Sequence, residues 1–154
     1  MGFAKIYDRK KALTAADLLN DRVIPFFDGH GLSVNRVLTD RGTEFCGAHH
    51  RREYELYLPV ENIDHKRTKA LSTQTNGIGA RFHKTPLDEC YRITFRRRVY
   101  RSIDEVQADL DEWVQQYNEA RIHQGRRCFG KTPMQTFLDS KPRAQAKQNM
   151  TMAA

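Results

Sequence analysis

Apolar side chains recur at helical spacing in the second half of the chain and predict its clearest helix over 103–117. Six apolar residues fall on one helical face there, with polar residues between most of them: Ile103, Val106, Leu110, Trp113, Val114 and Tyr117. Ser102 and Glu105 form a capping box at its start. A later helix is predicted to begin at Thr132–Pro133, a cap followed by proline at the first helical position, with residues 137–138 buried behind it.

The first third of the chain carries a second helical stripe, over 16–27. Thr14 is the expected N-cap, with Asp17 three residues later as a weak capping box. Pro25 predicts a bend near the end of this helix, since proline removes a helical hydrogen bond. The glycines at 29–31 predict its end.

Short apolar runs predict strands between the helices. Phe3–Tyr7, Val34–Leu38 and Val60–His65 each fit a short strand, Glu53–Leu58 fits a helical segment, and a helix is expected from about Gly77 towards Arg101. Strands that alternate with helices indicate an α/β fold.

Length and charge narrow the class of partner. The 154 residues fit one domain and carry a net charge of +7, and no apolar run could span a membrane. Residues 65–101 hold ten basic and two acidic groups, whereas 102–124 hold one basic and six acidic groups. A concentrated positive charge favours a polyanionic partner, nucleic acid first; the alternative is a solvated basic helix face. Residues 141–154 lack a pattern and are expected to form a disordered basic tail.

The three cysteines lie far apart and form no CxxC pair, which indicates a reducing, cytoplasmic compartment. Cys46 precedes His49 and His50, a group that could suggest zinc. Structural zinc sites need four ligands, usually in two spaced pairs, and no second pair is evident. The favoured interpretation is a packed cysteine beside two loop histidines.

Four segments together resemble the catalytic cores of DDE-type transposases and retroviral-type integrases, most closely the bacterial insertion-sequence branch. They are LTDRGTEF at 38–45, QTNGI at 74–78 followed by RFHKT at 81–85, YNEARIHQ at 117–124 and GKTP at 130–133. They occur in the family's order. The resemblance implies a ribonuclease-H-like α/β core over residues 1–140, with C-terminal helices, and a role in DNA transposition and integration.

The resemblance also implies a site that lacks two of its three acids. Such cores hold two divalent metals, Mg²⁺ in the family, with Asp, Asp and Glu. Asp40 matches the second acid, but Ala80 stands where the Glu is expected. Phe3–Tyr7 resembles the family's third strand, so the core is expected to lack its first strands and the first acid. One carboxylate cannot hold Mg²⁺ productively, and the chain is expected to be catalytically inactive.

Candidate DNA-binding residues lie in the basic middle segment. By resemblance, the helix after Ala80 faces DNA, and a denser arginine cluster follows it. The alternative for both groups is surface charge, with intramolecular pairing to the acidic helix. The candidates are Arg81, His83, Lys84, Arg96, Arg97 and Arg98.

Other residues in these segments are interpreted as structural first. Pro86 and Gly79 weaken the helix around Ala80, although a tolerated kink is the neutral alternative. Glu44, Asp64 and His65 could touch the surroundings of the metal site, but a structural role is favoured. The remaining residues treated as structural are Tyr117, Asn118, Arg121, His123 and Trp113, the last as core.

Three functions remain open at this point. The first is an inactive fragment of a DDE transposase. The second is a module that binds DNA, the full-length transposase or a second copy, and so inhibits transposition. The third is an enzyme completed by a separate upstream chain, against which Ala80 counts because that position lies within the present chain.

Overall fold

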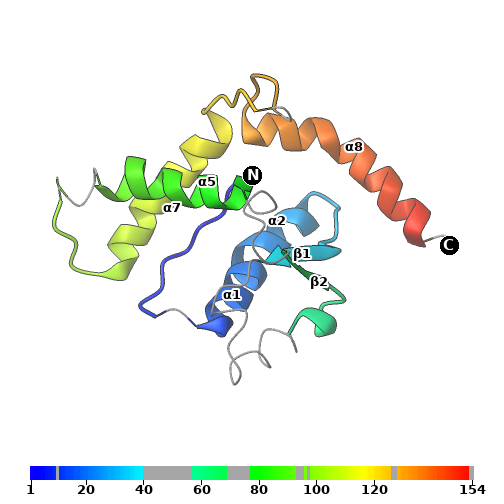
Figure 1. Cartoon of the computed structure of the whole chain (residues 1–154), viewed down its shortest axis with the longest axis horizontal. Helices are drawn as coiled ribbons and strands as arrows, with labels where there is room; N and C mark the ends of the chain where they lie inside the picture. Colours follow the sequence, from blue (N-terminus) through cyan, green and yellow to red (C-terminus); the bar gives the residue numbers. More distant parts are fainter. Residues whose placement is uncertain are drawn as a thin grey trace.

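The computed structural model describes residues 1–9, 11–39, 57–68, 77–92, 96, 98–125 and 128–152. In the view of Figure 1, helices lie around a small sheet, and the C-terminal helix runs from the top to the right-hand side. Asp40, Cys46 and Arg97 lie outside the described residues. None of the described helices is long and apolar enough to cross a membrane.

The N-terminal helical run is continuous but changes its pitch. It comprises α1 (Ala12–Leu18), a π-helical turn η1 (Leu19–Val23) and α2 (Ile24–Gly29), with Pro25 in the first turn of α2. Pro25 therefore lies where the π-helical turn passes into α2, inside a continuous helical run. The prediction that Thr14 caps the helix is wrong, because its hydroxyl donates to the Lys11 carbonyl at 2.6 Å.

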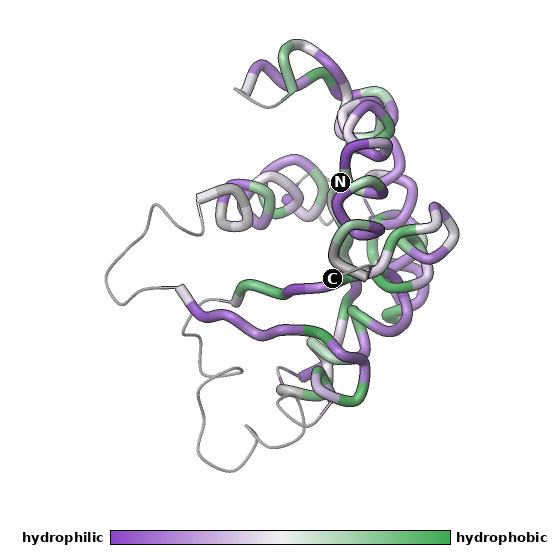
Figure 2. Tube along the Cα trace, turned by 90° about the vertical axis from the view of Figure 1, so that its right-hand side faces the viewer, coloured by the Kyte–Doolittle hydropathy of each residue, from purple (hydrophilic) through white to green (hydrophobic). Residues whose placement is uncertain are grey.

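The described sheet has two parallel strands, β1 (Arg36–Thr39) and β2 (Asp64–Arg67). Arg36 lies opposite Asp64, and Thr39 lies opposite Arg67. The second strand begins later than predicted, because Val60 still belongs to a helical turn and Asn62 turns the chain with a φ of 55°. All four residues of β2 are hydrophilic, so its position was hard to find from an apolar pattern (Figure 2).

The prediction of a strand at Phe3–Tyr7 is wrong. This segment is extended, but side chains of a helix take the place of a neighbouring strand. The Gly2 N–H donates to Asn118 Oδ1 at 2.8 Å, and Asn118 Nδ2 donates to the Gly2 carbonyl at 2.9 Å. The Ile6 N–H donates to Gln107 Oε1 at 2.8 Å. Three backbone groups in and next to this segment are therefore satisfied by side chains of α7 (Ile103–Glu119).

The basic segment, residues 65–101, contains the helix α5 (Gly77–Pro86), which continues into the π-helical turn η3 (Leu87–Tyr91). Pro86 is buried inside this path, so the kink is tolerated. Residue 96 is still helical, whereas residues 98–100 have no regular structure, so the helix ends before Arg101. The prediction of a helix reaching towards 101 is therefore too long.

The last two helices are α7 (Ile103–Glu119) and α8 (Pro133–Met152). Both predicted caps are confirmed: the Glu105 N–H donates to Ser102 Oγ at 3.3 Å, and the Gln135 N–H donates to Thr132 Oγ1 at 3.2 Å.

The prediction of a disordered tail over 141–154 is wrong for residues 141–152, which continue α8 through Pro142. Gln148 Nε2 donates to the Ser33 carbonyl at 2.7 Å and so fixes the far end of this helix to the segment before β1. Leu138, predicted to be buried, is 41% exposed.

The described core lies between the N-terminal helices and the sheet. Ala16, Leu58 and Ile63 are its buried centre, with half-buried apolar residues of η1 and β1 around it. A second, aromatic cluster joins Phe26 to Phe137, whose ring centroids lie 5.0 Å apart. This contact packs the start of α8 against α2.

Candidate nucleic-acid interface and the adjoining sheet edge

The two strands are parallel, so both end at the same edge of the sheet. β1 ends at Thr39, directly before Asp40 in the sequence, so the prediction of a strand that leads into Asp40 agrees with the structure. The Thr68 N–H donates to the Thr39 carbonyl at 2.9 Å, and Thr39 Oγ1 lies 2.8 Å from His65 Nε2. The carboxyl ends of parallel strands are where open α/β sheets keep their sites.

The polar residues of β2 have structural contacts at this edge. Asp64 accepts from Arg36 Nε at 2.6 Å across the two strands. Burial lowers the pKa of His65, so the ring is held neutral against Thr39. A hollow of about 600 Å³ runs along β2 and includes these side chains among its lining. These contacts agree with the structural role favoured for Asp64 and His65.

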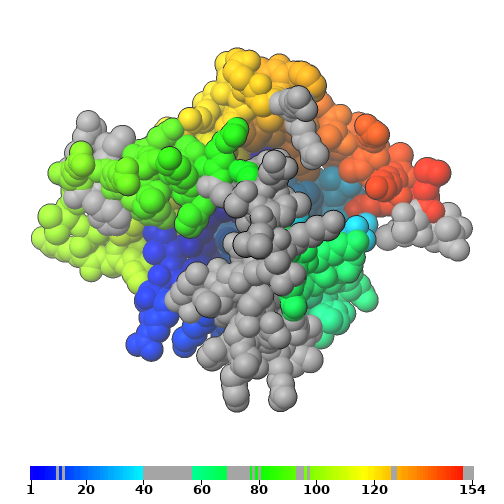
Figure 3. All heavy atoms as spheres, viewed as in Figure 1, coloured from blue at the N-terminus to red at the C-terminus, as the bar shows by residue number. Residues whose placement is uncertain are grey.

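Helix α5 presents basic side chains to solvent. Arg81, His83 and Lys84 are all exposed, and no ion pair joins them to another residue in the described ranges. Phe82, between them in sequence, faces the opposite way: its ring lies 5.1 Å from that of Tyr117 and packs against Gly2. The anchoring of Phe82 therefore fixes which side of α5 faces outward, and the outer surface of α5 is visible in Figure 3.

The arginine cluster after α5 is not one surface in the described chain. Arg96 is exposed, and Arg97 lies outside the described residues. Arg98 turns towards α7, where its guanidinium lies 3.4 Å from Asp109 and 5.3 Å from the Tyr100 ring centroid. Part of the positive charge near residue 98 is therefore neutralised by the acidic helix.

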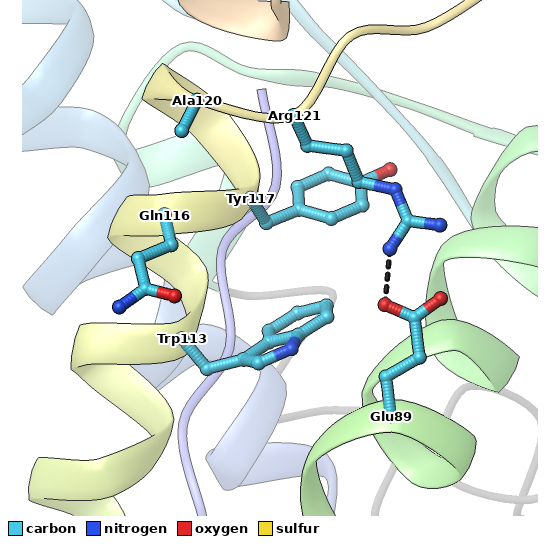
Figure 4. A pocket seen from close by; sticks show the side chains of 6 residues that line it. All are labelled: Glu89, Trp113, Gln116, Tyr117, Ala120 and Arg121. Atoms are coloured by element: carbon cyan, nitrogen blue, oxygen red, sulfur yellow. Dashed lines mark hydrogen bonds and ion pairs between the residues drawn. The ribbon is translucent and has the colours of Figure 1, made fainter.

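A hollow of about 320 Å³ between η3 and α7 was not predicted from the sequence (Figure 4). Trp113 is half-buried at its wall and stacks on Tyr117, with the ring centroids 5.2 Å apart, so its assignment to the core is wrong. Arg121 pairs with Glu89 and lies over the Tyr117 ring. The pair joins residues 32 positions apart, for which a single sequence gives no signal.

No cluster of three or more His, Cys, Asp or Glu that could hold a metal occurs within the described residues. Position 80 lies in the first turn of α5, and an alanine there supplies no oxygen ligand. The residue present at this position therefore does not fit a carboxylate metal site.

Residues 61–133 match the family model described as the integrase core domain. The resemblance to integrase cores is confirmed. The matched region of this integrase-like chain contains β2, α5, α7 and the loop after α7, and thus includes the exposed surface of α5.

One curated relative and one solved structure extend the comparison. The chain is 25% identical over 126 residues to a putative integrase of Spiroplasma virus SpV1-C74; the alignment covers 77% of this chain and 34% of that protein. The chain thus spans about a third of the length of the curated relative it matches. It also resembles the crystal structure of the catalytic core domain of BIV integrase, with a TM-score of 0.61 and 17% identity. That match covers 90% of this chain and 78% of the other, so the fold is that of an integrase catalytic core.

Proposed function

We propose that this chain acts in DNA transposition or integration as a DNA-binding integrase core that does not catalyse strand transfer by itself. The observation that carries the proposal is the exposed basic surface of α5, which lies within the region matched to integrase cores and directly follows Ala80. Mg²⁺ is the metal of the family, and DNA is the partner proposed here. The proposed setting is the bacterial cytoplasm.

DNA binding is supported by the exposed basic side chains of α5. Arg81 and Lys84 are three residues apart, which places them on neighbouring positions of one helix face. Cations at this spacing can contact successive phosphates without reading the base sequence. Because their charges are not neutralised by other described residues, they are available to displace condensed counterions from DNA.

The proposed inactivity rests on the alanine at position 80. Two-metal phosphodiester chemistry needs carboxylates that bridge and hold both ions. The resemblance assigns Asp40 and position 80 to two of the three acids, and the methyl group of Ala80 cannot coordinate a hard cation. The remaining Asp40 would hold a divalent ion weakly and in incomplete geometry.

Fluorescence anisotropy with a labelled random DNA duplex tests the binding. The double variant Arg81→Ala/Lys84→Ala should reduce the slope of log affinity against log salt by about 2. The matched control is Arg9→Ala/Lys11→Ala, which removes the same charge from exposed positions outside α5. Equal slopes for both double variants would mean that only net charge matters. No binding at low salt would refute the proposal.

Plasmid nicking with Mg²⁺ or Mn²⁺ tests the proposed inactivity. Purified protein should leave supercoiled DNA intact, because the alanine at position 80 supplies no ligand to the two metals. Nicking by the natural protein, lost when Asp40→Asn is introduced, would contradict the proposed inactivity. That outcome would assign catalysis to a site that includes Asp40.

A second candidate function is a module that inhibits transposition by binding the full-length transposase or a second copy. The hollow at Trp113 favours it, since half-buried tryptophans are enriched at protein interfaces. Co-expression with an active transposase of the same branch tests it. Inhibition that survives Arg81→Ala/Lys84→Ala but is lost in Trp113→Ala would favour protein binding over competition for DNA.

A further inference from the structure

The hollow between η3 and α7 has an aromatic wall that the proposed DNA binding does not use. The wall consists of Trp113 and Tyr117, which project from successive turns of α7 towards Glu89 on η3 (Figure 4). The two rings stack with their centroids 5.2 Å apart. Trp113 is half-buried, so part of the wall stays open to a ligand in a hollow of about 320 Å³.

A side chain of the chain itself shows which chemistry fits this wall. The guanidinium of Arg121 lies 5.6 Å from the Tyr117 ring centroid and pairs with the Glu89 carboxylate. An aromatic face beside a carboxylate suits a guanidinium, because this planar group stacks on the ring while its N–H groups donate to the carboxylate oxygens. The hollow thus already binds one arginine side chain, from within the same chain.

The carboxylate of this pair comes from an unusual backbone element. Glu89 lies in the π-helical turn η3, which interrupts the helical run that begins with α5. Single π-helical turns inside helices are rare and occur frequently at functional sites. The backbone that carries Glu89 is therefore a second, independent reason to assign a binding role to the hollow.

The internal ion pair can be exchanged for one with another protein. The side chains of Arg121 and Glu89 are each 42% exposed, and an ion pair at this exposure contributes little because water screens it. Arg121 follows the end of α7 and belongs to no helix or strand. Its side chain can thus leave the hollow without unfolding an element, and an arginine of another protein can take its place.

The charge beside the hollow selects a basic partner. Residues 102–124 hold six acidic groups and one basic group, Arg121, in a chain of net charge +7. Glu112 and Glu119 are exposed, and no ion pair joins either of them to another residue of the described ranges. Gln116 lines the hollow four positions after Glu112 and three before Glu119, so both carboxylates border it. This acidic edge repels DNA and attracts a cationic segment.

We propose that the hollow between η3 and α7 binds an arginine side chain from a basic segment of a partner protein. The incoming guanidinium replaces that of Arg121 on Glu89 and stacks on the aromatic wall. Neighbouring cations of the segment lie along the acidic edge of α7. The inference rests on the second candidate function, to which it adds the chemistry of the partner, and it is independent of DNA binding by α5.

The test measures binding of two labelled octapeptides by fluorescence anisotropy, one of alternating arginine and glycine and one of alternating lysine and glycine. Both peptides carry the same charge, so the ratio of their affinities isolates the contribution of the guanidinium. The natural protein should bind the arginine peptide about fivefold or more tightly than the lysine peptide. Trp113 is the only tryptophan of the chain, and its fluorescence should change saturably as the arginine peptide binds.

Two substitutions in the hollow should change this ratio in opposite directions. Glu89→Gln removes the carboxylate, so the ratio should fall to about 1–2. Arg121→Gln removes the internal competitor, so the ratio should rise about threefold. The matched controls Asp104→Asn and Arg101→Gln make the same charge changes at exposed positions outside the hollow and should leave the ratio unchanged. Thermal unfolding checks that all four variants fold.

Equal affinity for both peptides in the natural protein, or an unchanged ratio in Glu89→Gln, would overturn the arginine site. Binding without a change in Trp113 fluorescence would place the peptide elsewhere and overturn it too. So would a concentration-dependent dimer that Glu89→Gln abolishes, because the hollow would then belong to a second copy. If Trp113→Ala abolishes the inhibition measured by co-expression but neither peptide binds, the second candidate function would stand and the arginine chemistry proposed here would be wrong.

Discussion

Replacing Asn118 by alanine should release the N-terminal segment from α7. Asn118 is buried, and its side chain binds both backbone groups of Gly2, at 2.8 and 2.9 Å. In Asn118→Ala both hydrogen bonds are lost, and the Gly2 N–H and carbonyl remain without these partners in a buried position. The helix itself should not suffer, because alanine is the best helix former.

The size of the stability loss follows from the two backbone groups of Gly2 that lose their hydrogen-bond partners. Each buried polar group left unsatisfied costs about 1–3 kcal/mol, so the free energy of unfolding should fall by about 2–4 kcal/mol if the segment relaxes in part. A domain of this size has about 5–15 kcal/mol in total. The loss is therefore large enough to be measured and small enough to leave a folded population.

Urea unfolding followed by Trp113 fluorescence and far-UV circular dichroism measures this loss, with any tag placed after residue 154. Trp113 is a suitable probe because it stacks on Tyr117, one residue before Asn118. The matched control is Gln115→Ala, an exposed site on the same helix that should change stability by less than about 0.5 kcal/mol. A loss in Asn118→Ala no larger than this control would refute the reasoning.

Gly2 offers an independent check on the same contact. A Cβ at this position would lie 2.3 Å from Phe82 Cε2, so Gly2→Ala must displace the segment or the ring. If both substitutions break one docking contact, Gly2→Ala/Asn118→Ala should cost less than the sum of the single variants. Simple additivity would mean that the two residues act separately.

Three further predictions concern other elements. Ser102→Ala should lower the free energy of unfolding by about 1 kcal/mol, because it removes the cap of α7, and Ser102→Asp should restore it; equal stability of both variants would contradict the cap. The lowered pKa of His65 means that the folded state prefers the neutral ring, so the contribution of this ring to stability is present above the ordinary pKa of 6.5 and is lost as the pH falls through the folded-state pKa. In urea titrations from pH 7 downward, the free energy of unfolding should therefore fall less in His65→Gln than in the natural sequence. An equal fall in both proteins would refute the prediction. Gln148→Ala should increase amide hydrogen exchange in the C-terminal half of α8 but not in α7, because it frees that end from Ser33; unchanged exchange would show that the contact does not hold the helix.

The helices could largely be predicted from the sequence, because their signals are local. The apolar stripe of α7, its capping box and the Thr132–Pro133 start of α8 each lie within a few residues and were confirmed. The errors occurred where a distant partner decides the outcome. Residues 141–152 have no apolar pattern of their own, yet Gln148 binds the segment before β1 and the helix continues. Phe3–Tyr7 has the composition of a strand, but Gln107 and Asn118 replace the strand's neighbour.

The candidate site was predictable in its residue types but only partly in its arrangement. The basic character of α5 followed from the sequence, whereas its outward face is set by Phe82 packing on Tyr117, a contact between residues 35 positions apart. The dense run of arginines suggested one surface, but Asp109 draws Arg98 towards α7.

DNA binding and catalysis depend differently on single residues. This difference supports the proposal that the chain binds DNA without catalysing strand transfer. A two-metal site needs its carboxylates together, so under the proposed assignment an alanine at position 80 is enough to abolish catalysis while the surrounding fold stays intact. Phosphate contacts add up nearly independently, and each exposed cation contributes its own counterion release. Under the proposal, the alanine at position 80 does not affect DNA binding by Arg81 and Lys84, because the packing of Phe82, and not a metal, sets which side of α5 is exposed. Restoring a carboxylate with Ala80→Glu should accordingly leave the Arg81- and Lys84-dependent salt slope unchanged.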